Sequence, residues 1–382
     1  MVSDQTLKLR KVDIVHLTSA HSILDTRIFV KEARALEEAG FIVAVVGPGD
    51  ATVKRQIDGI QLYSITRPSN RLQRFTSFSL KLYQTVLKIH PKVVHIHDPD
   101  LLNMGLFLRR HGIKVVYDVH EDFPQALLSR TWLGPIPIRH IVAWLVRIYE
   151  NLSAKWLDGL VLADAQISDH IKSNSTVIVR NYLEVGEWST DVLENNRRAQ
   201  TLRAIYVGDI SEARGLSRMC DAIYTARQMG LEITLDLIGP ISNSIRETVG
   251  RHPAAPYILL HGWGSRAEVA KMMRESDIAF CLLQPTPAYV DALPVKVLEY
   301  IISGLPIVAT DLPRLRKEIA LAGAFQFVGC NAASEDIVGA IRKAVSINAN
   351  ERSRLQKSVI KNYNWSNEAM KLISFYETLL IR

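Results

Sequence analysis

The sequence contains little cysteine and no apolar run long enough to cross a membrane. Its 382 residues include three cysteines, Cys220, Cys281 and Cys330, which are far apart and odd in number. This pattern favours reduced thiols over disulfides or a CxxC metal or redox site. A membrane span needs about 20 consecutive apolar residues, and residues 1–10 are polar and lack the apolar core of a secretory signal. We therefore expect a cytoplasmic protein.

Acidic residues are scarce between residues 51 and 92, although the formal net charge of the whole chain is only +7. Asp58 is the single acid there. The apolar side chains Leu72, Phe75, Phe78 and Leu82 are interleaved with lysines and arginines of the same stretch. Such a surface is typical of peripheral contact with an anionic membrane, and a phosphate-bearing acceptor or a solvated basic face are the alternatives. Nucleic acid is disfavoured as a partner because no RNA-binding, zinc-finger or helix-turn-helix pattern accompanies the charge.

Apolar residues make up 48% of the chain and charged residues 22%, which indicates a folded protein of about two domains. Short Val/Ile/Leu-rich runs alternate with longer amphipathic stretches, the pattern of parallel sheets covered by helices on both faces. The expected strands of the first half are 13–17, 42–46, 60–65, 93–97, 114–119, 159–162 and 176–180. Those of the second half are 204–207, 233–238, 257–260, 278–282, 307–309 and 324–328.

The polar stretch 184–203 separates the two halves and is expected to be an interdomain linker. We predict an N-terminal domain over 1–185 and a C-terminal domain over 200–364. A terminal helix over 365–382 is expected to pack back on the N-terminal domain. The fold class is therefore α/β, with two Rossmann-like doubly wound domains that face each other across a ligand-binding cleft.

The segment 285–311, PTPAYVDALPVKVLEYIISGLPIVATD, predicts a helix that begins near Pro294 after a strand-end loop. A helix start attracts phosphate through its free amides and its dipole, and Lys296 in the first turn adds a full charge. The amides expected to be free belong to Ala292, Leu293 and Val295. A capped surface helix is the alternative interpretation.

Two carboxylates flank this helix start. Glu299 can accept hydrogen bonds from a ribose diol, and Asp291, eight positions earlier, can reach a sugar hydroxyl. An acid, seven residues, a glutamate and then GLPIVATD resemble the signature of family 4 of the retaining glycosyltransferases. The resemblance implies the GT-B fold and a nucleoside-diphosphate sugar as donor. It also implies that 1–185 is the acceptor-side domain and 200–364 the nucleotide-sugar domain. The family usually has glutamate where this chain has Asp291.

Two further segments of the second half resemble that family. In IYVGDISEARGL, Gly208 allows close backbone approach and Arg214 offers a fork of donors to a diphosphate, although Asp209 stands where relatives have arginine. In HGWGSRAEVA, a GxGxxA pattern suggests a dehydrogenase, but no acid ends the next strand to bind a ribose. The resemblance instead implies backbone contacts to the base there, with Trp263 as the nucleobase contact.

In the first half, VVYDVHEDFP places His120 directly after a strand, and Asp122 is expected to face the acceptor. A core histidine is the alternative, but the segment resembles the family's strand-end histidine, which contacts the donor sugar. Asp25 and Arg27 resemble the Asp-Thr-Arg of a bacterial branch, which implies acceptor binding. An N-cap is the alternative for Asp25.

His95, His97 and Asp98 suggest a metal hydrolase, because alternate residues of a strand share a face. The HxHxDH pattern needs an aspartate where Pro99 stands, which argues against that class. No carboxylate pair of the DxD type ends a strand of the second half, so we expect no metal and no cofactor.

We therefore expect a retaining, metal-independent hexosyltransferase. It would move a sugar from a nucleotide-sugar donor, UDP-linked, to a glycan or lipid-linked acceptor in polysaccharide or cell-envelope biosynthesis. His120 and Asp291 would orient the sugar while Arg214 and Lys296 stabilise the leaving diphosphate. A nucleotide-sugar epimerase on the same fold and a non-catalytic binding protein are the alternatives.

Overall fold

The chain divides into two α/β units. The computed structural model describes residues 11–128, 130–173, 175–185, 201–286, 289–290, 293–319 and 325–381. Unit 1 comprises residues 1–181 and 365–382, and unit 2 comprises residues 182–364. The chain therefore returns to unit 1 for its last helix. Most of the expected linker, residues 186–200, lies outside the described residues.

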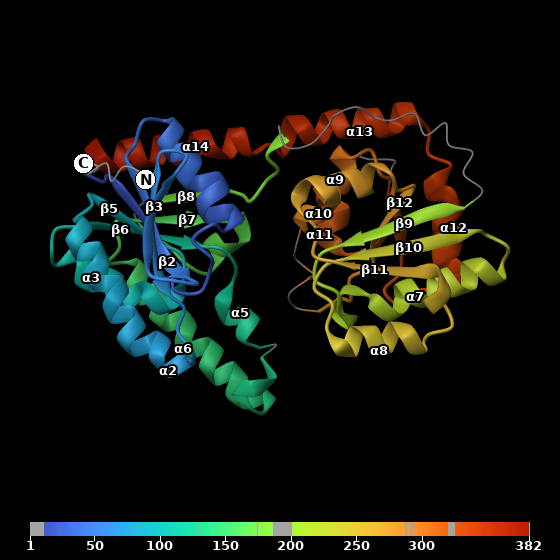
Figure 1. The fold of residues 1–382 in the computed structure, drawn as a ribbon, viewed down its shortest axis with the longest axis horizontal. Helices are drawn as coiled ribbons and strands as arrows, with labels where there is room; N and C mark the ends of the chain where they lie inside the picture. Colours follow the sequence, from blue (N-terminus) through green and yellow to red (C-terminus); the bar gives the residue numbers. More distant parts are fainter. Residues whose placement is uncertain are drawn as a thin grey trace, which may run out of the picture. The chain divides into compact units, whose positions relative to one another are not determined.

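Unit 1 contains an eight-stranded sheet in the order β3-β4-β2-β1-β5-β6-β7-β8 (Figure 1). Its strands are β1 (Ile14–Leu17), β2 (Val43–Gly49), β3 (Val53–Ile57), β4 (Ile60–Thr66), β5 (Val93–Ile96), β6 (Lys114–Val119), β7 (Gly159–Leu162) and β8 (Thr176–Ile178). The seven expected strands are confirmed. They pair in parallel and are mostly buried, as strands covered by helices on both faces must be.

The eighth strand, β3, was not expected from the sequence. It pairs antiparallel with β4 at the edge of the sheet, and four of its five residues are exposed. Because an exposed edge strand buries no apolar face, Lys54, Arg55 and Gln56 carry no strand pattern. Part of the basic stretch 51–92 is therefore sheet edge.

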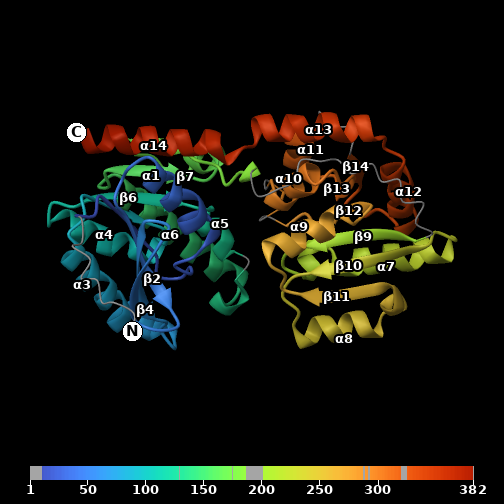
Figure 2. The ribbon, with the colours of Figure 1, turned by 45° about the horizontal axis from the view of Figure 1, so that its top comes forward.

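Helices cover both faces of the unit 1 sheet (Figure 2). One face packs on η1 (Thr26–Ala33, a π-helix), α1 (Arg34–Glu38) and the terminal helix α14 (Trp365–Ile381). The other face packs on α3 (Ser79–Ile89), α4 (Leu102–Arg109) and the end of α6 (Ile136–Ala154). The remaining helical segments of unit 1 are α2 (Arg71–Gln73), η2 (Arg74–Phe78), η3 (Pro99–Leu101), α5 (Phe123–Leu127), η4 (Thr131–Leu133) and η5 (Ala165–Asp169).

Unit 2 contains a six-stranded parallel sheet in the order β11-β10-β9-β12-β13-β14. Its strands are β9 (Leu202–Val207), β10 (Ile233–Ile238), β11 (Ile258–Gly262), β12 (Ile278–Cys281), β13 (Ile307–Thr310) and β14 (Phe325–Val328). All six were expected, with bounds that differ by one or two residues. Both units are thus doubly wound α/β domains, which confirms the predicted fold class.

Helices also cover both faces of the unit 2 sheet (Figure 1). One face packs on α9 (Arg266–Arg274), α10 (Val295–Ile302), α11 (Pro313–Ile319) and α13 (Ala349–Asn362). The other face packs on η7 (Glu212–Arg214) with α7 (Leu216–Gln228), α8 (Asn243–Arg251) with η8 (Ala255–Tyr257), and α12 (Ser334–Val345).

The strand order of each sheet reverses at one place, between β1 and β5 in unit 1 and between β9 and β12 in unit 2. In open parallel sheets ligands bind beyond the carboxyl ends of the strands at this switch point. The loops after these four strands are therefore the first places to look for a site. Among the described residues, no helix has the length and apolar character needed to cross a membrane.

Candidate functional site

Two cations converge at the switch point of unit 2. Lys296, in the first turn of α10, donates a hydrogen bond from Nζ to the Tyr206 hydroxyl at 2.7 Å and lies 4.0 Å from the centre of the Tyr206 ring. Tyr206 is near the end of β9, and its hydroxyl donates to the Asp209 carbonyl at 2.8 Å. The phenol thus holds the ammonium beside the loop that follows β9.

Burial lowers the pKa of Lys296. The side chain is almost completely buried, and burial lowers the pKa of Lys296 to about 8. Among the described residues no carboxylate is hydrogen-bonded to this ammonium, so it has electrostatic capacity for an anion. The ammonium can therefore gain stabilisation from a bound phosphate.

Arg214 is the second cation. Its Nε donates to the Tyr289 hydroxyl at 3.1 Å and lies 3.5 Å from Asp209 Oδ2. The side chain is half-buried, and its guanidinium is oriented by these two neighbours. Asp209, which departs from the family pattern, thus pairs with the remaining arginine.

The backbone at Gly208 lies between the two cations. A Cβ built there would lie 3.4 Å from Lys296 Nζ and 3.8 Å from Arg214 Nη1, and the φ of Gly208 is +123°. Gly215 has a φ of +86°, and a Cβ there would lie 2.2 Å from the Leu282 carbonyl oxygen. Glycine is therefore required at both positions, for the left-handed backbone and, at Gly215, for close packing.

The other predicted donor contacts belong to α10 and to loops of unit 2. Glu299 is half-buried one turn after Lys296, and Leu293 is half-buried just before α10. Trp263 is 82% exposed in the loop after β11. Asp291 lies outside the described residues. Unit 2 thus combines two cations, a carboxylate and a surface indole near the carboxyl ends of its strands.

In unit 1, His120 lies directly after β6 and belongs to a buried hydrogen-bond network. Its Nε2 lies 2.5 Å from Asp118 Oδ2, and His97 Nδ1 lies 3.1 Å from both groups. Burial alone would raise the pKa of the Asp118 carboxyl, but Arg27 and then His120 outweigh it and hold the pKa well below its usual value. Asp118 is therefore a carboxylate that orients both imidazoles.

Arg27 was predicted to bind the acceptor, and the structure contradicts this role. The side chain is 4% exposed, and its guanidinium donates two hydrogen bonds to Asp118, at 2.7 and 2.8 Å, and one to the Val179 carbonyl. Such a guanidinium has no face left for a ligand. Its role is to neutralise Asp118 inside unit 1.

The two other predicted acceptor residues are helix caps. Asp25 accepts hydrogen bonds from the amides of Arg27 and Ile28 at the start of η1, which is the alternative that the sequence left open. Asp122 caps α5 and is paired with Arg147 at 2.8 Å. Their carboxylates remain partly exposed, but capping alone accounts for both residue types.

A polar cluster lies at the switch point of unit 1, and of its members only Asp98 was singled out from the sequence, as part of a metal-hydrolase pattern. Asp98 accepts hydrogen bonds from the Thr18 hydroxyl and the Ser19 amide, each at 2.7 Å. Asp100 accepts from Ser19 and Arg74. A sequence signal for this cluster exists. Thr-Ser directly follows β1, Asp-Pro-Asp comes just after β5, and these two strands are neighbours in the sheet.

A second unexpected cluster lies deeper in unit 1. His16, Glu32, His95 and His97 are all buried, and one polar atom from each lies within 4.8 Å of the others. His95 and His97 had suggested a metal hydrolase. Their actual neighbours, His16 and Glu32, come from β1 and η1, and no spacing in the sequence connects these elements.

The expected basic and apolar face over 51–92 is only partly correct. Leu72 and Phe75 are exposed, whereas Phe78 and Leu82 are in the core. A larger exposed apolar surface lies on α6, where residues at helical spacing form a stripe. This α6 stripe consists of Ile138, Ile141, Trp144, Leu145, Ile148 and Leu152.

The matches to known proteins agree with this architecture. The model of "Glycosyltransferase Family 4" matches residues 26–186, and that of "Glycosyl transferases group 1" matches residues 191–362. No curated protein matches the chain in sequence.

Solved structures resemble the chain over nearly its whole length. Sucrose-phosphate synthase from Thermosynechococcus elongatus is 14% identical with a TM-score of 0.76, covering 97% of this chain and 99% of that one. Anabaena HepE in complex with UDP and glucose is also 14% identical, with a TM-score of 0.70 and coverage of 97% and 100%. WaaG, a glycosyltransferase involved in lipopolysaccharide biosynthesis, is 17% identical, with a TM-score of 0.60 and coverage of 96% and 98%.

The two family models are adjacent and together account for most of both units. The doubly wound fold of each unit and the cations at the unit 2 switch point agree with them. The chain therefore belongs to the family 4 glycosyltransferases and has the GT-B fold.

Proposed function

We propose that this glycosyltransferase moves a hexose, with retention of configuration, from a UDP-linked donor to a glycan or lipid-linked acceptor in polysaccharide or cell-envelope synthesis. The observation that carries the proposal is the convergence of Arg214 and Lys296 on the backbone of Gly208. Two cations beside a left-handed glycine suit a diphosphate, which needs charge and close backbone approach. HepE, whose structure contains UDP and glucose, and WaaG, which acts in lipopolysaccharide biosynthesis, support the choice of donor and pathway.

The chemistry depends on positioning and electrostatics. Arg214 and Lys296 stabilise the negative charge that develops on the departing diphosphate, and the first amides of α10 add their dipole. Glu299 accepts hydrogen bonds from the ribose, Leu293 and Trp263 contact the nucleoside, and Asp291 orients the sugar. His120, held by Asp118, contacts the sugar near the reacting carbon.

The acceptor surface is assigned to the strand ends of unit 1, where Asp25 and Asp122 retain partly exposed carboxylates. The exposed face of α6 is assigned to an anionic membrane surface. Tryptophans at 132, 144 and 156 are exposed along this segment, and tryptophan prefers the membrane–water interface.

Charge supports the same assignment. Residues 130–156 contain four cations, Arg130, Arg139, Arg147 and Lys155, against one acid. That acid, Glu150, is buried on the opposite side of α6, and burial raises its pKa to about 7. The segment that carries the α6 stripe therefore has a net positive charge and no exposed acid of its own, although Arg147 is paired with Asp122.

The first prediction tests transfer itself. His120→Ala should lower UDP release from UDP-sugars by roughly 100-fold, as expected when a positioned polar group is lost in the transition state. UDP affinity should not change, because the diphosphate contacts lie in unit 2. Release of UDP from a panel of UDP-sugars is measured with and without acceptor glycans. An epimerised nucleotide sugar without UDP release, or ligand binding without any turnover, would replace the transferase with one of its two rivals.

The second prediction concerns pH. The protonated Lys296 binds the diphosphate, so UDP affinity should be constant below about pH 8 and fall above it, to roughly one tenth by about pH 9. Binding near pH 8 should take up a proton, because the diphosphate raises the pKa of this lysine again. Titration calorimetry in buffers of different ionisation enthalpy measures both effects.

Lys296→Arg provides the matched test, because arginine stays charged throughout this range. This variant should lose the decline in affinity above pH 8, whereas the exposed control Lys343→Arg should keep it. A wild-type affinity that does not change over this range would rule out Lys296 as the diphosphate ligand.

The third prediction is that donor binding needs no divalent metal, because Arg214 and Lys296 supply the compensating charge. UDP affinity should be equal in excess magnesium and in EDTA. Arg214→Ala should slow UDP release by an amount equivalent to roughly 2 to 4 kcal/mol, while the surface control Arg251→Ala should not. UDP binding that disappears in EDTA and returns with magnesium or manganese would contradict the proposal.

The fourth prediction concerns the membrane. Wild-type protein should sediment with anionic phosphatidylglycerol vesicles at low salt and be released as salt increases. Ile141→Glu combined with Trp144→Glu should weaken this association by roughly tenfold or more, because both changes place charge in the apolar layer. Met370→Glu on α14, an equally exposed apolar position, is the control. Equal sedimentation of all three proteins, or of none, would exclude the α6 stripe as a membrane contact.

A further inference from the structure

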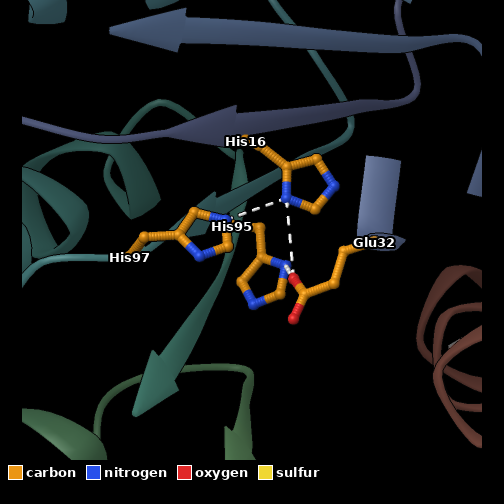
Figure 3. Close-up of side chains that lie close together, drawn as sticks. All are labelled: His16, Glu32, His95 and His97. Carbon is orange, nitrogen blue, oxygen red and sulfur yellow. Dashed lines mark hydrogen bonds and ion pairs between the residues drawn. The ribbon is translucent and has the colours of Figure 1, made fainter. Parts of the chain in front are cut away.

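Four buried side chains of unit 1 point toward a common centre, as Figure 3 shows. His16 and His95 face each other on the neighbouring strands β1 and β5, in direct register. His97 lies just after β5, and Glu32 reaches the centre from the π-helix η1. Two adjacent strands and a helix thus contribute three imidazoles and one carboxylate to a single buried point.

Several polar atoms of this group lack hydrogen-bond partners within the described part of the chain. They are His16 Nε2, both ring nitrogens of His95 and both carboxylate oxygens of Glu32. Each unpaired buried polar atom lowers the stability of the fold, and unpaired groups of this kind commonly mark a bound water or ion. So many in one place indicate that the group binds something.

The distances suit one metal ion. His16 Nδ1 lies 2.9 Å from His97 Nε2 and 3.9 Å from Glu32 Oε2, and His95 Nδ1 lies 3.7 Å from the same oxygen. In a tetrahedral zinc site with bonds of about 2.0 to 2.2 Å, ligand atoms are roughly 3.3 to 3.5 Å apart. The three distances lie on both sides of that range, and the four ligand atoms all lie within 4.8 Å of one another, so small side-chain shifts would bring them around one ion.

The groups around the cluster orient its members as metal ligands require. His97 Nδ1 lies 3.1 Å from the Asp118 carboxylate, so it carries the proton and leaves the lone pair of Nε2 directed at the centre. Carboxylate-oriented histidines of this kind are typical of metal sites. Arg27 Nε lies 3.0 Å from Glu32 Oε1, but the N–H of this nitrogen donates its hydrogen bond to Asp118. The other oxygen, Glu32 Oε2, is therefore available to the ion.

The charges also favour a cation. Arg27 lies beside both carboxylates, Asp118 and Glu32, but it donates its hydrogen bonds to Asp118. Glu32 Oε2 instead faces His16 and His95, so an anionic oxygen and two imidazoles lie around the same point.

A proton alone explains less than a metal ion does. It would neutralise Glu32, but it would leave both nitrogens of His95 without a partner. An ion bound to His95 Nδ1 and Glu32 Oε2 gives each of these two atoms a partner. The same ion can also bind His16 Nδ1 and His97 Nε2, which lie close together. Three imidazoles and one carboxylate suit a borderline transition metal such as Zn²⁺ better than Mg²⁺ or Ca²⁺.

We propose that His16, Glu32, His95 and His97 bind one divalent transition-metal ion, Zn²⁺ by ligand type, inside unit 1. The ion joins β1, β5 and η1, and through His97 and Asp118 it positions His120. It is separate from the diphosphate site of unit 2, and the proposal does not depend on which sugar is transferred.

The test is the metal content of the full-length, tag-free protein expressed with added zinc. Mass spectrometry should find about one zinc per chain in the wild type and less than about a tenth of that in His95→Gln and Glu32→Gln. His252→Gln, a surface histidine of unit 2, should keep its zinc. Prolonged treatment with dipicolinate should lower the melting temperature of the wild type but not of His95→Gln, and added zinc should restore it.

If His95→Gln does not fold, X-ray absorption at the zinc edge of the wild-type protein decides the question. It should show N/O ligands at about 2.0 to 2.2 Å with the multiple scattering of imidazole rings. Wild-type protein without zinc, folded His95→Gln with its zinc retained, or an edge spectrum without imidazole scattering would each overturn the proposal.

Discussion

The buried guanidinium of Arg27 is the interaction on which the organisation of unit 1 depends. It binds the two oxygens of Asp118 on β6 and the Val179 carbonyl just beyond β8, so it ties the π-helix η1 to two parts of the sheet. Removing one partner of a buried ion pair costs about 3 to 5 kcal/mol, because the other charge is left uncompensated. Since Asp118 in turn orients His97 and His120, the strand-end histidine depends on a residue that no ligand can touch.

In unit 2 a tyrosine hydroxyl holds the buried cation, whereas in unit 1 a carboxylate does. The phenol of Tyr206 donates to a backbone carbonyl and accepts from Lys296, so within the described part of unit 2 a hydroxyl, and no carboxylate, holds the ammonium. A carboxylate there would neutralise the lysine and compete with a phosphate for it. Tyr206 therefore keeps the cation in place and leaves its charge to the ligand.

Much of the fold could be predicted from local patterns, and less of the site. Apolar runs and their spacing were enough for thirteen of the fourteen strands, while the exposed edge strand β3 has no such pattern. Arg214 and Lys296 could be assigned because their loops have recognisable sequences. Arg27 could not be assigned correctly, because the motif in which it lies says nothing about the burial of its side chain. The sequence did not predict the α6 stripe. This helix has apolar residues on two sides, and the sequence pattern does not indicate which side is buried.

The sequence by itself determined the fold class, the family and the loops that carry Arg214 and Lys296, because each of these depends on residues close together in the chain. Tertiary structure decided what each polar side chain contacts. His16, Glu32, His95 and His97 form one cluster because β1 and β5 are neighbours in the sheet and η1 crosses over them. Burial and pKa are likewise properties of the surroundings, as Lys296 and Glu32 show. These surroundings come from segments far apart in sequence, which no local pattern can specify.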